Sequence, residues 1–454
     1  MPEVEDMKVL LVDPGRRYLE RSEPVPKVYP HIGLAYLGAV LVHEGISVSI
    51  FDEAVSDITF EEVLHTDPPD FVGITTMTFN VCDGYRIARL TKEHSDARVI
   101  MGGAHPSAVP HLTMEECPEC DIIVQGEGET SLLRIVRGEP LREIPGIFYR
   151  EGGNTCSTGP PDFIQNLDDL PFPDWTLFDY SRYCTIYSEK FAKRIQLHQV
   201  SGSRGCPHFC TFCYPLHGRS FRFRSHQSIV DEIEYNVERG AAHFDFTDST
   251  ATVVEKRFLR LCSAMIERGL HERITWNFET RVDLVNRNLF EAAQKAGCTM
   301  VFFGIESGDE KVLSSMNKNI DLTMVDTAVR TAVEAGLKVK VSFLVGHVFE
   351  TEESARNTYT LARNLRERYG VDISLNLIDI YPGTELYTMV EQGKGGARWI
   401  PGTRNNWSAY FRSTPLIEFD ALPSHRLIAL FQEFTEDLKK IPRDGFYETL
   451  EESP

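Results

Sequence analysis

Three cysteines lie close together near the middle of the chain, in the segment Gly205-Cys206-Pro-His-Phe-Cys210-Thr-Phe-Cys213. The C-x3-C-x2-C spacing follows an expected β-strand and places three thiolates on one short loop. Three thiolates can bind three irons of a [4Fe–4S] cluster, which leaves one iron without a protein ligand. A structural zinc site is the alternative, because His208 lies inside the loop and would complete a Cys3His ligand set.

This loop resembles the signature of the radical S-adenosylmethionine (radical SAM) superfamily. The resemblance implies that the amino and carboxylate groups of S-adenosylmethionine chelate the open iron. Phe212, the aromatic residue before the last cysteine, matches the family pattern, in which its backbone faces the adenine. Further segments resemble family landmarks in the right order over residues 196–390: Arg222-Phe-Arg224-Ser225, Arg281-Val-Asp283, Ala296-Gly-Cys298, Phe303-Gly-Ile-Glu-Ser307, Asn317-Lys318 and Pro382-Gly-Thr384.

The same resemblance implies contacts to S-adenosylmethionine from strand ends. Asp248 ends the second strand of the series, where the family often has an acid near the ammonium; the alternative is a helix N-cap. Glu279 and Arg281 end the third strand, and Glu306 and Ser307 end the fourth. Polar residues at carboxyl ends of barrel strands are placed for ligand contacts. For Arg281 and Glu306 the alternative is a mutual ion pair.

The fifth strand of this series, Val341 to Gly346, resembles the adenine-contacting strand of the family. The residues that follow it, His347-Val-Phe, depart from a commoner Pro-Gly turn. The resemblance therefore gives no shape for this loop.

Residues 196–390 alternate strand and helix signals. Because the series holds six βα units, we expect a partial (β/α)6 barrel of the TIM type, with its site at the strand carboxyl ends. Strands are expected at 197–201, 243–247, 274–279, 299–305, 338–345 and 373–380, and helices at 226–239, 255–268, 286–296, 321–335 and 351–368.

Residues 1–140 form an earlier alternating series. Continuous apolar strands between amphipathic helices predict an α/β domain with a doubly wound parallel sheet, whose ligand lies beyond the strand carboxyl ends. Strands are expected at 8–12, 48–51, 71–75, 99–101 and 121–125, and helices at 33–44 and 81–93.

Two further regions complete the expected organisation. Residues 141–195 predict a β-hairpin followed by a linker, because the prolines of Asp169-Leu-Pro-Phe-Pro-Asp174 exclude a regular element. Residues 391–454 form a small C-terminal extension with one helix at 424–439.

The first domain resembles the cobalamin-binding domain of a large radical SAM subfamily. The matching segments are His31-Ile-Gly-Leu-Ala-Tyr-Leu, Gly102-Gly103-Ala-His105-Pro106 and Gly126-Glu127-Gly128-Glu129. Glycines let the backbone approach a bulky tetrapyrrole or its nucleotide tail, and Thr75 and Thr76 are placed to hydrogen-bond that tail.

One loop of this domain departs from the cobalamin mutases and methionine synthase. Their first strand is followed by Asp-x-His-x-x-Gly, whose histidine ligates cobalt, whereas this chain reads Asp13-Pro-Gly15-Arg16-Arg17-Tyr18. Loops without the histidine are usual in the radical SAM subfamily. The alternative is a domain that binds nothing or another ligand. A nicotinamide site is disfavoured because no G-x-G-x-x-G follows the strand.

Composition and charge disfavour several classes of partner. Of the 454 residues, 47 are Lys or Arg and 67 are Asp or Glu, so the net charge is −20. That sign opposes binding to nucleic acid and to anionic membranes. The N-terminus lacks the features of a secretory signal, and no apolar run reaches the ~20 residues of a spanning helix. We expect a cytoplasmic protein without membrane insertion, whose ten cysteines are thiols or metal ligands.

Together these resemblances imply a radical enzyme. The reduced cluster would cleave S-adenosylmethionine to a 5′-deoxyadenosyl radical, which abstracts hydrogen from an unactivated carbon, and cobalamin would supply a methyl group. We therefore expect a cobalamin-dependent C-methyltransferase for a small molecule, served by an external one-electron reductant of the flavodoxin or ferredoxin type. Ring closure, as in anaerobic tetrapyrrole cyclases, and dehydration or epimerisation are alternatives. A non-catalytic iron–sulfur carrier or sensor is disfavoured, because such proteins normally use four ligands.

The substrate cannot be inferred from the residues. Arg219, Arg222 and Arg224 follow the cysteine loop and could reach it, as could the segment from Trp399 to Trp407. The alternative is that the arginines pair with acidic helices and the tryptophans fill the C-terminal core.

Overall fold

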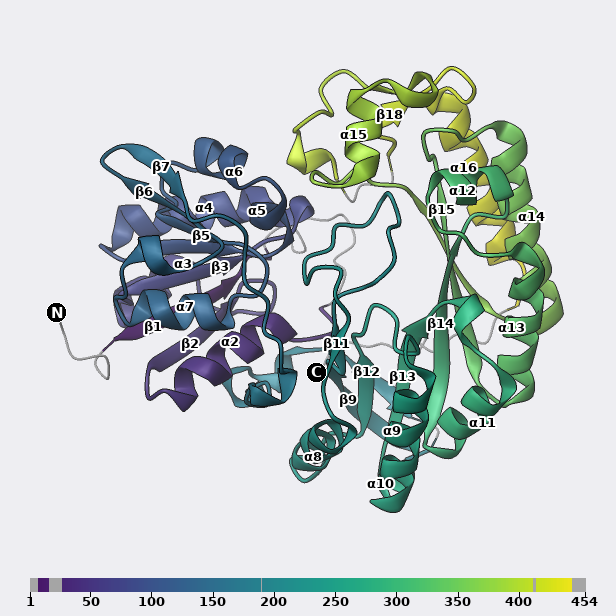
Figure 1. The fold of residues 1–454 in the computed structure, drawn as a ribbon, viewed down its shortest axis with the longest axis horizontal. Coiled ribbons are helices and arrows are strands. Elements are labelled where there is room, and N and C mark those ends of the chain that lie inside the picture. Colours follow the sequence, from purple (N-terminus) through teal and green to yellow (C-terminus); the bar gives the residue numbers. More distant parts are fainter. Residues whose placement is uncertain (1–6, 16–26, 189, 411–413, 443–454) are drawn as a thin grey trace. The chain divides into compact units, whose positions relative to one another are not determined.

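The computed structural model describes residues 7–15, 27–188, 190–410 and 414–442 (Figure 1). The chain forms two compact units, one consisting mainly of residues 1–185 and the other mainly of residues 186–450, with Tyr214–Gly218 belonging to the first. Each unit has its own sheet. Within the described ranges, no helix combines the length and the apolar character needed to cross a bilayer.

The described part of the first unit contains a seven-stranded sheet in the order β2-β1-β3-β4-β5-β6-β7. The first five strands are parallel, and β6 and β7 are antiparallel. The expected doubly wound sheet is therefore confirmed. The strands are β1 (Lys8–Asp13), β2 (Ser47–Asp52), β3 (Phe71–Thr75), β4 (Arg98–Gly102), β5 (Ile122–Val124), β6 (Ile147–Glu151) and β7 (Asn154–Ser157).

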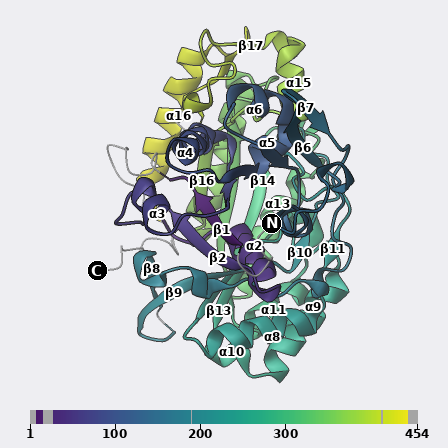
Figure 2. The same cartoon turned by 90° about the vertical axis from the view of Figure 1, so that its left-hand side faces the viewer.

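Amphipathic and apolar helices pack against this sheet, and several can be followed in Figure 2. They are α2 (Ile32–His43), α3 (Phe60–Thr66), α4 (Val81–His94), α5 (Ala104–Ala108), α6 (Pro110–Glu116) and α7 (Glu129–Val136). β1 is buried along Val9–Asp13, as a strand covered on both faces must be.

The structure changes the expected boundary at residue 140. The hairpin at β6 and β7 is present, but it extends the first sheet, because β6 pairs antiparallel with β5. The compact unit runs to Thr185, and the second sheet begins there. Only the segment between β7 and β8, with short 3-10 turns at Leu167–Asp169, Trp175–Leu177 and Tyr180–Arg182, has the irregular character expected of a linker.

The second unit contains a curved sheet in the order β16-β15-β14-β13-β12-β9-β8. Six of the described strands, β9 and β12 to β16, are mutually parallel, which confirms the expected partial barrel. The strands are β8 (Thr185–Ser188), β9 (Lys193–Val200), β12 (His243–Phe246), β13 (Thr275–Thr280), β14 (Cys298–Glu306), β15 (Lys338–Val345) and β16 (Asp372–Leu377). A short ribbon, β10 (Ser203–Arg204) with β11 (Arg222–Phe223), flanks the cysteine loop.

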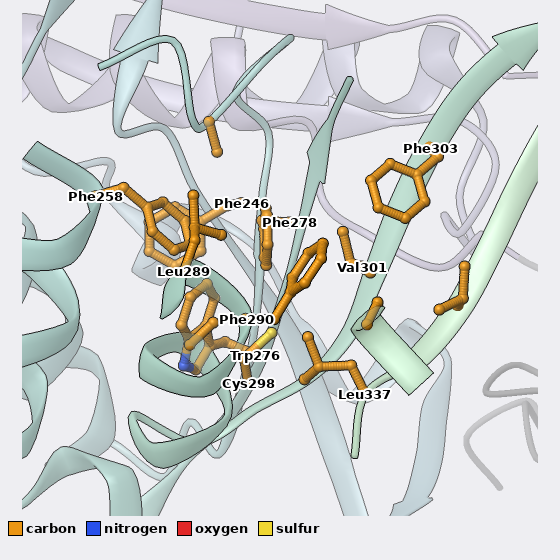
Figure 3. Close-up of a cluster of buried hydrophobic side chains, with 14 of the residues drawn as sticks. Phe246, Phe258, Trp276, Phe278, Leu289, Phe290, Cys298, Val301, Phe303 and Leu337 are labelled. Atoms are coloured by element: carbon orange, nitrogen blue, oxygen red, sulfur yellow. The ribbon is translucent and has the colours of Figure 1, made fainter. Parts of the chain in front are cut away.

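Helices cover the outer face of this sheet (Figure 1). They are α8 (His226–Val237), α9 (Glu255–Glu267), α10 (Leu270–Arg273), α11 (Arg287–Lys295), α12 (Glu310–Ser315), α13 (Leu322–Glu334) and α14 (Glu352–Tyr369). Between sheet and helices lies an apolar core, part of which Figure 3 shows around Trp276, Phe278 and Phe290.

The C-terminal part consists of α15 (Glu385–Glu391), β17 (Arg398–Trp399), β18 (Ile417–Glu418) and α16 (Ser424–Lys439). Tyr359 of α14 and Phe434 of α16 stack with ring centroids 4.3 Å apart, which fixes α16 on the barrel helices. Trp407 is buried beside Tyr410, as the core-filling alternative expected. The extension is therefore part of the second unit.

Candidate cofactor sites

The cysteine loop lies between β10 and β11 and has no regular secondary structure, so hydrogen bonds from other segments hold it. The backbone N–H of Thr211 donates to the Met316 carbonyl (2.9 Å), and the Thr211 carbonyl accepts from the Leu386 N–H (2.8 Å). The Asn317 side-chain amide donates to the Phe209 carbonyl (2.8 Å). The loop is thus fastened to the segment after α12 and to the start of α15.

Charged side chains surround the middle cysteine of this loop. Burial raises the pKa of the Cys210 thiol, Lys318 and Arg281 act to lower it, and Glu306 acts to raise it. Iron binding displaces the thiol proton, and the two cations favour the resulting negative charge.

The separation of possible ligands distinguishes a cluster from a single ion. In the described part of the chain, no three His, Cys, Asp or Glu side chains are grouped closely enough to hold one metal ion. Zinc needs all its ligands around one centre, whereas a [4Fe–4S] cluster places each thiolate on a different iron. A cluster therefore does not require the three thiols of the loop to meet at one centre.

Arg281 does not pair with Glu306. The Arg281 guanidinium binds both oxygens of Asp283 (2.9 and 3.0 Å) and donates to the Lys318 carbonyl (2.9 Å). Glu306 instead accepts from the Lys318 ammonium (3.0 Å). The mutual ion pair considered above is wrong, because each side chain has another partner.

Glu306 lies at an irregularity in β14. Its φ is +73°, a left-handed conformation that costs free energy in a residue other than glycine. The pairing with β15 shifts register between Gly304 and Glu306. A Cβ at Gly304 would lie 2.4 Å from Glu306 Oε1 and 3.1 Å from Lys318 Nζ, so a side chain at this position would displace the Glu306 carboxylate from its present place.

Lys318 lies beside these groups; the sequence marked Asn317-Lys318 as a family landmark but gave Lys318 no ligand contact. Its ammonium is buried beside Glu306 and close to Cys210. The flanking residues Asn317 and Asn319 both have positive φ (53° and 49°), which forms the turn that brings Lys318 inward. Asparagine tolerates this conformation better than most residues, so the Asn-Lys-Asn sequence was the available signal.

Asp248 and Ser307, two residues expected to contact a ligand, instead form hydrogen bonds with other residues of the protein. Asp248 accepts from the Gly202 N–H (2.9 Å) and from the Ser203 hydroxyl, so it holds the turn before the cysteine loop. It is not a helix N-cap, because α9 begins at Glu255. Ser307 contacts the Thr358 hydroxyl (3.1 Å) and accepts from the Asp309 N–H (3.2 Å).

The inner face of the half-barrel is polar. Phe246, Trp276 and Phe278 point into the helix-covered core, so the alternate residues Asp245 and Glu279 lie on the other face. Desolvation raises the pKa of the buried Asp245 carboxyl group to about 7, whereas the Glu279 side chain is exposed. Closed barrels fill this space with branched apolar residues; here a polar ligand has hydrogen-bonding partners.

Phe212 is half-buried in the cysteine loop.

In the first unit, the expected residues gather at the carboxyl ends of β3 and β4. The Thr76 N–H donates to the Gly102 carbonyl (2.9 Å). Gly103 has φ of +95°, and a Cβ there would lie 2.5 Å from the Thr76 carbonyl oxygen. Thr75 is half-buried, whereas the Thr76 hydroxyl is buried without a hydrogen-bond partner in the described ranges. An orphaned hydroxyl at this edge of a doubly wound sheet fits a bound ligand.

The segment after β5 is held differently. The Gly126 N–H donates to the Ser107 hydroxyl (3.0 Å). Glu127 accepts from the Ile164 N–H (2.8 Å) and contacts His217 Nδ1 (3.2 Å), and its side chain is fully buried. Glu127 therefore fixes neighbouring segments, while Gly126 shapes the turn at φ of +69°.

Lys27, Asp13 and Asp52 form a buried charge cluster that the sequence did not predict. The Lys27 ammonium pairs with Asp13 and with Asp52 (2.7 Å), and the Tyr183 hydroxyl donates to Asp52 (2.7 Å). Burial alone would lower the pKa of Lys27, but the two carboxylates outweigh it and raise that pKa. Arg16 to Tyr18, part of the loop compared above with the mutases, lie outside the described residues.

Comparison with known proteins places this geometry in a family. The Radical SAM superfamily model matches residues 200–362, and the B12 binding domain model matches residues 23–136. An uncharacterized methyltransferase of Pyrococcus horikoshii is 33% identical over 393 residues, covering 84% of this chain and 82% of its own. The chain belongs to the radical SAM superfamily. Within it, the chain carries a B12-binding domain before the radical SAM domain, so its cofactors are a [4Fe–4S] cluster, S-adenosylmethionine and cobalamin.

Two further matches cover most of this radical SAM protein. The anaerobic magnesium-protoporphyrin IX monomethyl ester cyclase of Cereibacter sphaeroides is 30% identical over 78% of this chain and 60% of its own length. The radical SAM methyltransferase TsrM of Kitasatospora setae, solved with cobalamin and a [4Fe–4S] cluster, superposes with a TM-score of 0.69 at 20% identity, covering 87% of this chain and 76% of TsrM. The second match shows the shared fold.

We predict that Gly304→Ala disrupts the Glu306–Lys318 pair. The new Cβ would meet Glu306 Oε1 at 2.4 Å, and overpacking of this kind typically costs about 1–3 kcal/mol. Thermal unfolding should show the loss. Ser342→Ala is the control. Ser342 pairs with Gly304 across β14 and β15, and its substitution by alanine adds no atom. Equal unfolding temperatures for the Gly304→Ala protein and the wild type would contradict the steric argument.

Proposed function

We propose that this protein is a cobalamin-dependent radical SAM C-methyltransferase acting on an unactivated carbon of a small molecule. The observation that carries the proposal is the match, across both units, to a relative described as a methyltransferase. Relatives from Chlorobaculum tepidum and Streptomyces wedmorensis, 25% and 27% identical, are also described as methyltransferases.

Cys206, Cys210 and Cys213 would hold the cluster, since they are the three thiols of the anchored loop. Glu279, Arg281 and Glu306 would bind S-adenosylmethionine, joined by Lys318. Charge-assisted hydrogen bonds from these groups suit a zwitterionic ligand. When bound, the cluster supplies an electron to S-adenosylmethionine and cobalamin carries a methyl group. Phe212 would present its backbone to the adenine.

Asp248 and Ser307 would contribute indirectly. Both oxygens of Asp248 accept from Gly202 and Ser203, and the Ser307 hydroxyl lies between Thr358 and Asp309. These contacts fix the backbone beside the site. We therefore assign them to the positioning of neighbouring groups.

Thr75, Thr76, Gly102, Gly103 and Gly126 would hold cobalamin at the strand ends of the first sheet. The buried, unpartnered Thr76 hydroxyl is available to the ligand. Glu127 would support the site indirectly, because it holds the Ile164 backbone and the His217 imidazole.

The reaction needs electrons from outside. Radical SAM enzymes require a reductant, and we propose a one-electron donor of the flavodoxin or ferredoxin type. The substrate is a small molecule, and the polar inner face around Asp245 and Glu279 favours one with polar groups.

The second candidate is oxidative cyclisation without net methyl transfer. It is favoured by the 30% identity to the magnesium-protoporphyrin cyclase, although the chain spans only 60% of that enzyme.

Products from S-adenosylmethionine separate the two candidates. We predict that the reconstituted protein, incubated anaerobically with S-adenosylmethionine and reductant, forms 5′-deoxyadenosine by reductive cleavage and about one S-adenosylhomocysteine per bound cobalamin, because reduced cobalamin would accept one methyl group without a substrate. Mass spectrometry measures both. Omission of cobalamin should abolish the formation of S-adenosylhomocysteine. Formation of 5′-deoxyadenosine alone would move the function to cyclisation or rearrangement.

The cobalt environment provides another prediction. No histidine occurs between Asp13 and Lys27, so this loop offers no imidazole. We expect bound cobalamin to have its dimethylbenzimidazole base dissociated. The Co(II) form should then show no strong axial nitrogen coupling in electron paramagnetic resonance (EPR). A coupling from a protein imidazole would refute this, and free cobalamin serves as the spectral control.

Arg281→Ala should weaken S-adenosylmethionine binding. Loss of one charge-assisted bond of about 2 kcal/mol corresponds to roughly thirtyfold in affinity. Iron content should stay unchanged. Asp283→Asn is the matched control, because it removes the partner charge of Arg281 and leaves the guanidinium. Unchanged affinity with a lower melting temperature in both variants would leave Arg281 a structural role only.

A further inference from the structure

His347 lies directly after β15, at the point where the sequence departs from the commoner family turn. Its side chain is completely buried. Nε2 lies 3.2 Å from the Thr211 hydroxyl, and Nδ1 lies 3.1 Å from the Ser315 hydroxyl. One imidazole thus joins the cysteine loop to the end of α12.

The direction of these hydrogen bonds follows from Ser315. The Ser315 hydroxyl donates to the Val312 carbonyl (2.7 Å), so toward His347 it must accept. His347 therefore carries its proton on Nδ1. Burial lowers the pKa of His347 to about 4, so the ring is neutral and Nε2 is an acceptor. The Thr211 hydroxyl then donates to Nε2.

Thr211 is held at three atoms by three separate segments. Its N–H binds Met316, its carbonyl binds Leu386, and its hydroxyl binds His347. Thr211 directly follows Cys210 and precedes Cys213 by two residues. A displacement of Thr211 would therefore move two of the three thiols.

The turn that carries His347 is itself fixed. Glu350 is fully buried and accepts from the Gly346 N–H (3.1 Å) and from the Ser354 hydroxyl (2.5 Å). His347 is consequently a rigid attachment between β15 and the cysteine loop.

We propose that His347 is a positioning residue that holds the cysteine loop in register with the end of β15, and so sets how S-adenosylmethionine meets the cluster. The inference rests on the proposed function, in which the loop binds the cluster, and on the resemblance of Val341 to Gly346 to the adenine-contacting strand of the family. A phenylalanine of similar volume would fill the space, but it would give Thr211 no acceptor and Ser315 no donor.

The test compares three single variants, His347→Phe, His347→Gln and Thr211→Val, in the reconstituted holoenzyme. A glutamine amide offers a donor and an acceptor on one group and should rescue the contacts in part. We expect His347→Phe and Thr211→Val to retain iron, and to bind S-adenosylmethionine about fivefold to tenfold more weakly, as for one lost hydrogen bond. The change that S-adenosylmethionine causes in the EPR spectrum of the reduced cluster should also be altered.

A double variant and a control complete the experiment. Because Thr211→Val removes a bond that His347→Phe already removes, the double variant should be little worse than His347→Phe alone. Thr91→Val is the control, since its buried hydroxyl bonds only within α4, to Ile87 (2.8 Å).

Two results would overturn the proposal. The first is a His347→Phe protein that binds S-adenosylmethionine within twofold of the wild-type affinity and shows an unchanged EPR response to it. The second is an equal loss of iron and melting temperature in the Phe and Gln variants, which would make His347 purely structural. Failure of the proposed function is distinguishable, because Cys206, Cys210 and Cys213 changed together to Ala would then leave the iron content unchanged.

Discussion

A loop without regular secondary structure must hold three thiols at fixed positions, and the second unit is arranged around that constraint. A helix satisfies most of its own backbone groups and a strand pairs with its neighbours in the sheet, but the cysteine loop depends on separate partners elsewhere in the chain. Those partners come from the segment after α12, from the start of α15 and from the turn after β15. Distant elements of the sheet and its helices thus meet at Thr211, and the apolar core beneath them keeps these elements in place.

The same logic explains why several acidic residues are not available to a ligand. Asp248 and Glu127 are buried, and a buried carboxylate is costly unless it accepts hydrogen bonds. Each is satisfied within the protein, Asp248 by the turn before the cysteine loop and Glu127 by Ile164 and His217. Such groups shape a binding site by fixing the segments around it.

Sequence periodicity predicted the elements well, because each helix or strand depends on residues close in the chain. The expected helix at 424–439 and the strand at 338–345 match α16 and β15. The expected linker at 141–195 was wrong at β6 and β7, which belong to the first sheet. The place of β6 is set by its pairing with β5, which a local sequence pattern cannot reveal. The pairing of Arg281 with Asp283 was missed although the two residues are close in the chain, because a sequence pattern does not show which of two carboxylates a guanidinium contacts. The Lys27 cluster joins residues from Asp13 to Tyr183, which are up to 170 positions apart, so it left no local signal.

The six parallel strands of the second sheet have a further consequence. Eight strands close a barrel whose circumference is fixed by hydrogen bonding around the ring. In the described part of this chain, the curved sheet ends at β16 on one side and at β8 on the other, so no ladder closes it. Because the opening between the two edges is set by loops and not by strand pairing, its width can change in evolution without altering the sheet. Relatives described as acting on molecules as different as tetrapyrroles and a cytidylyl phosphonate are compatible with one such scaffold.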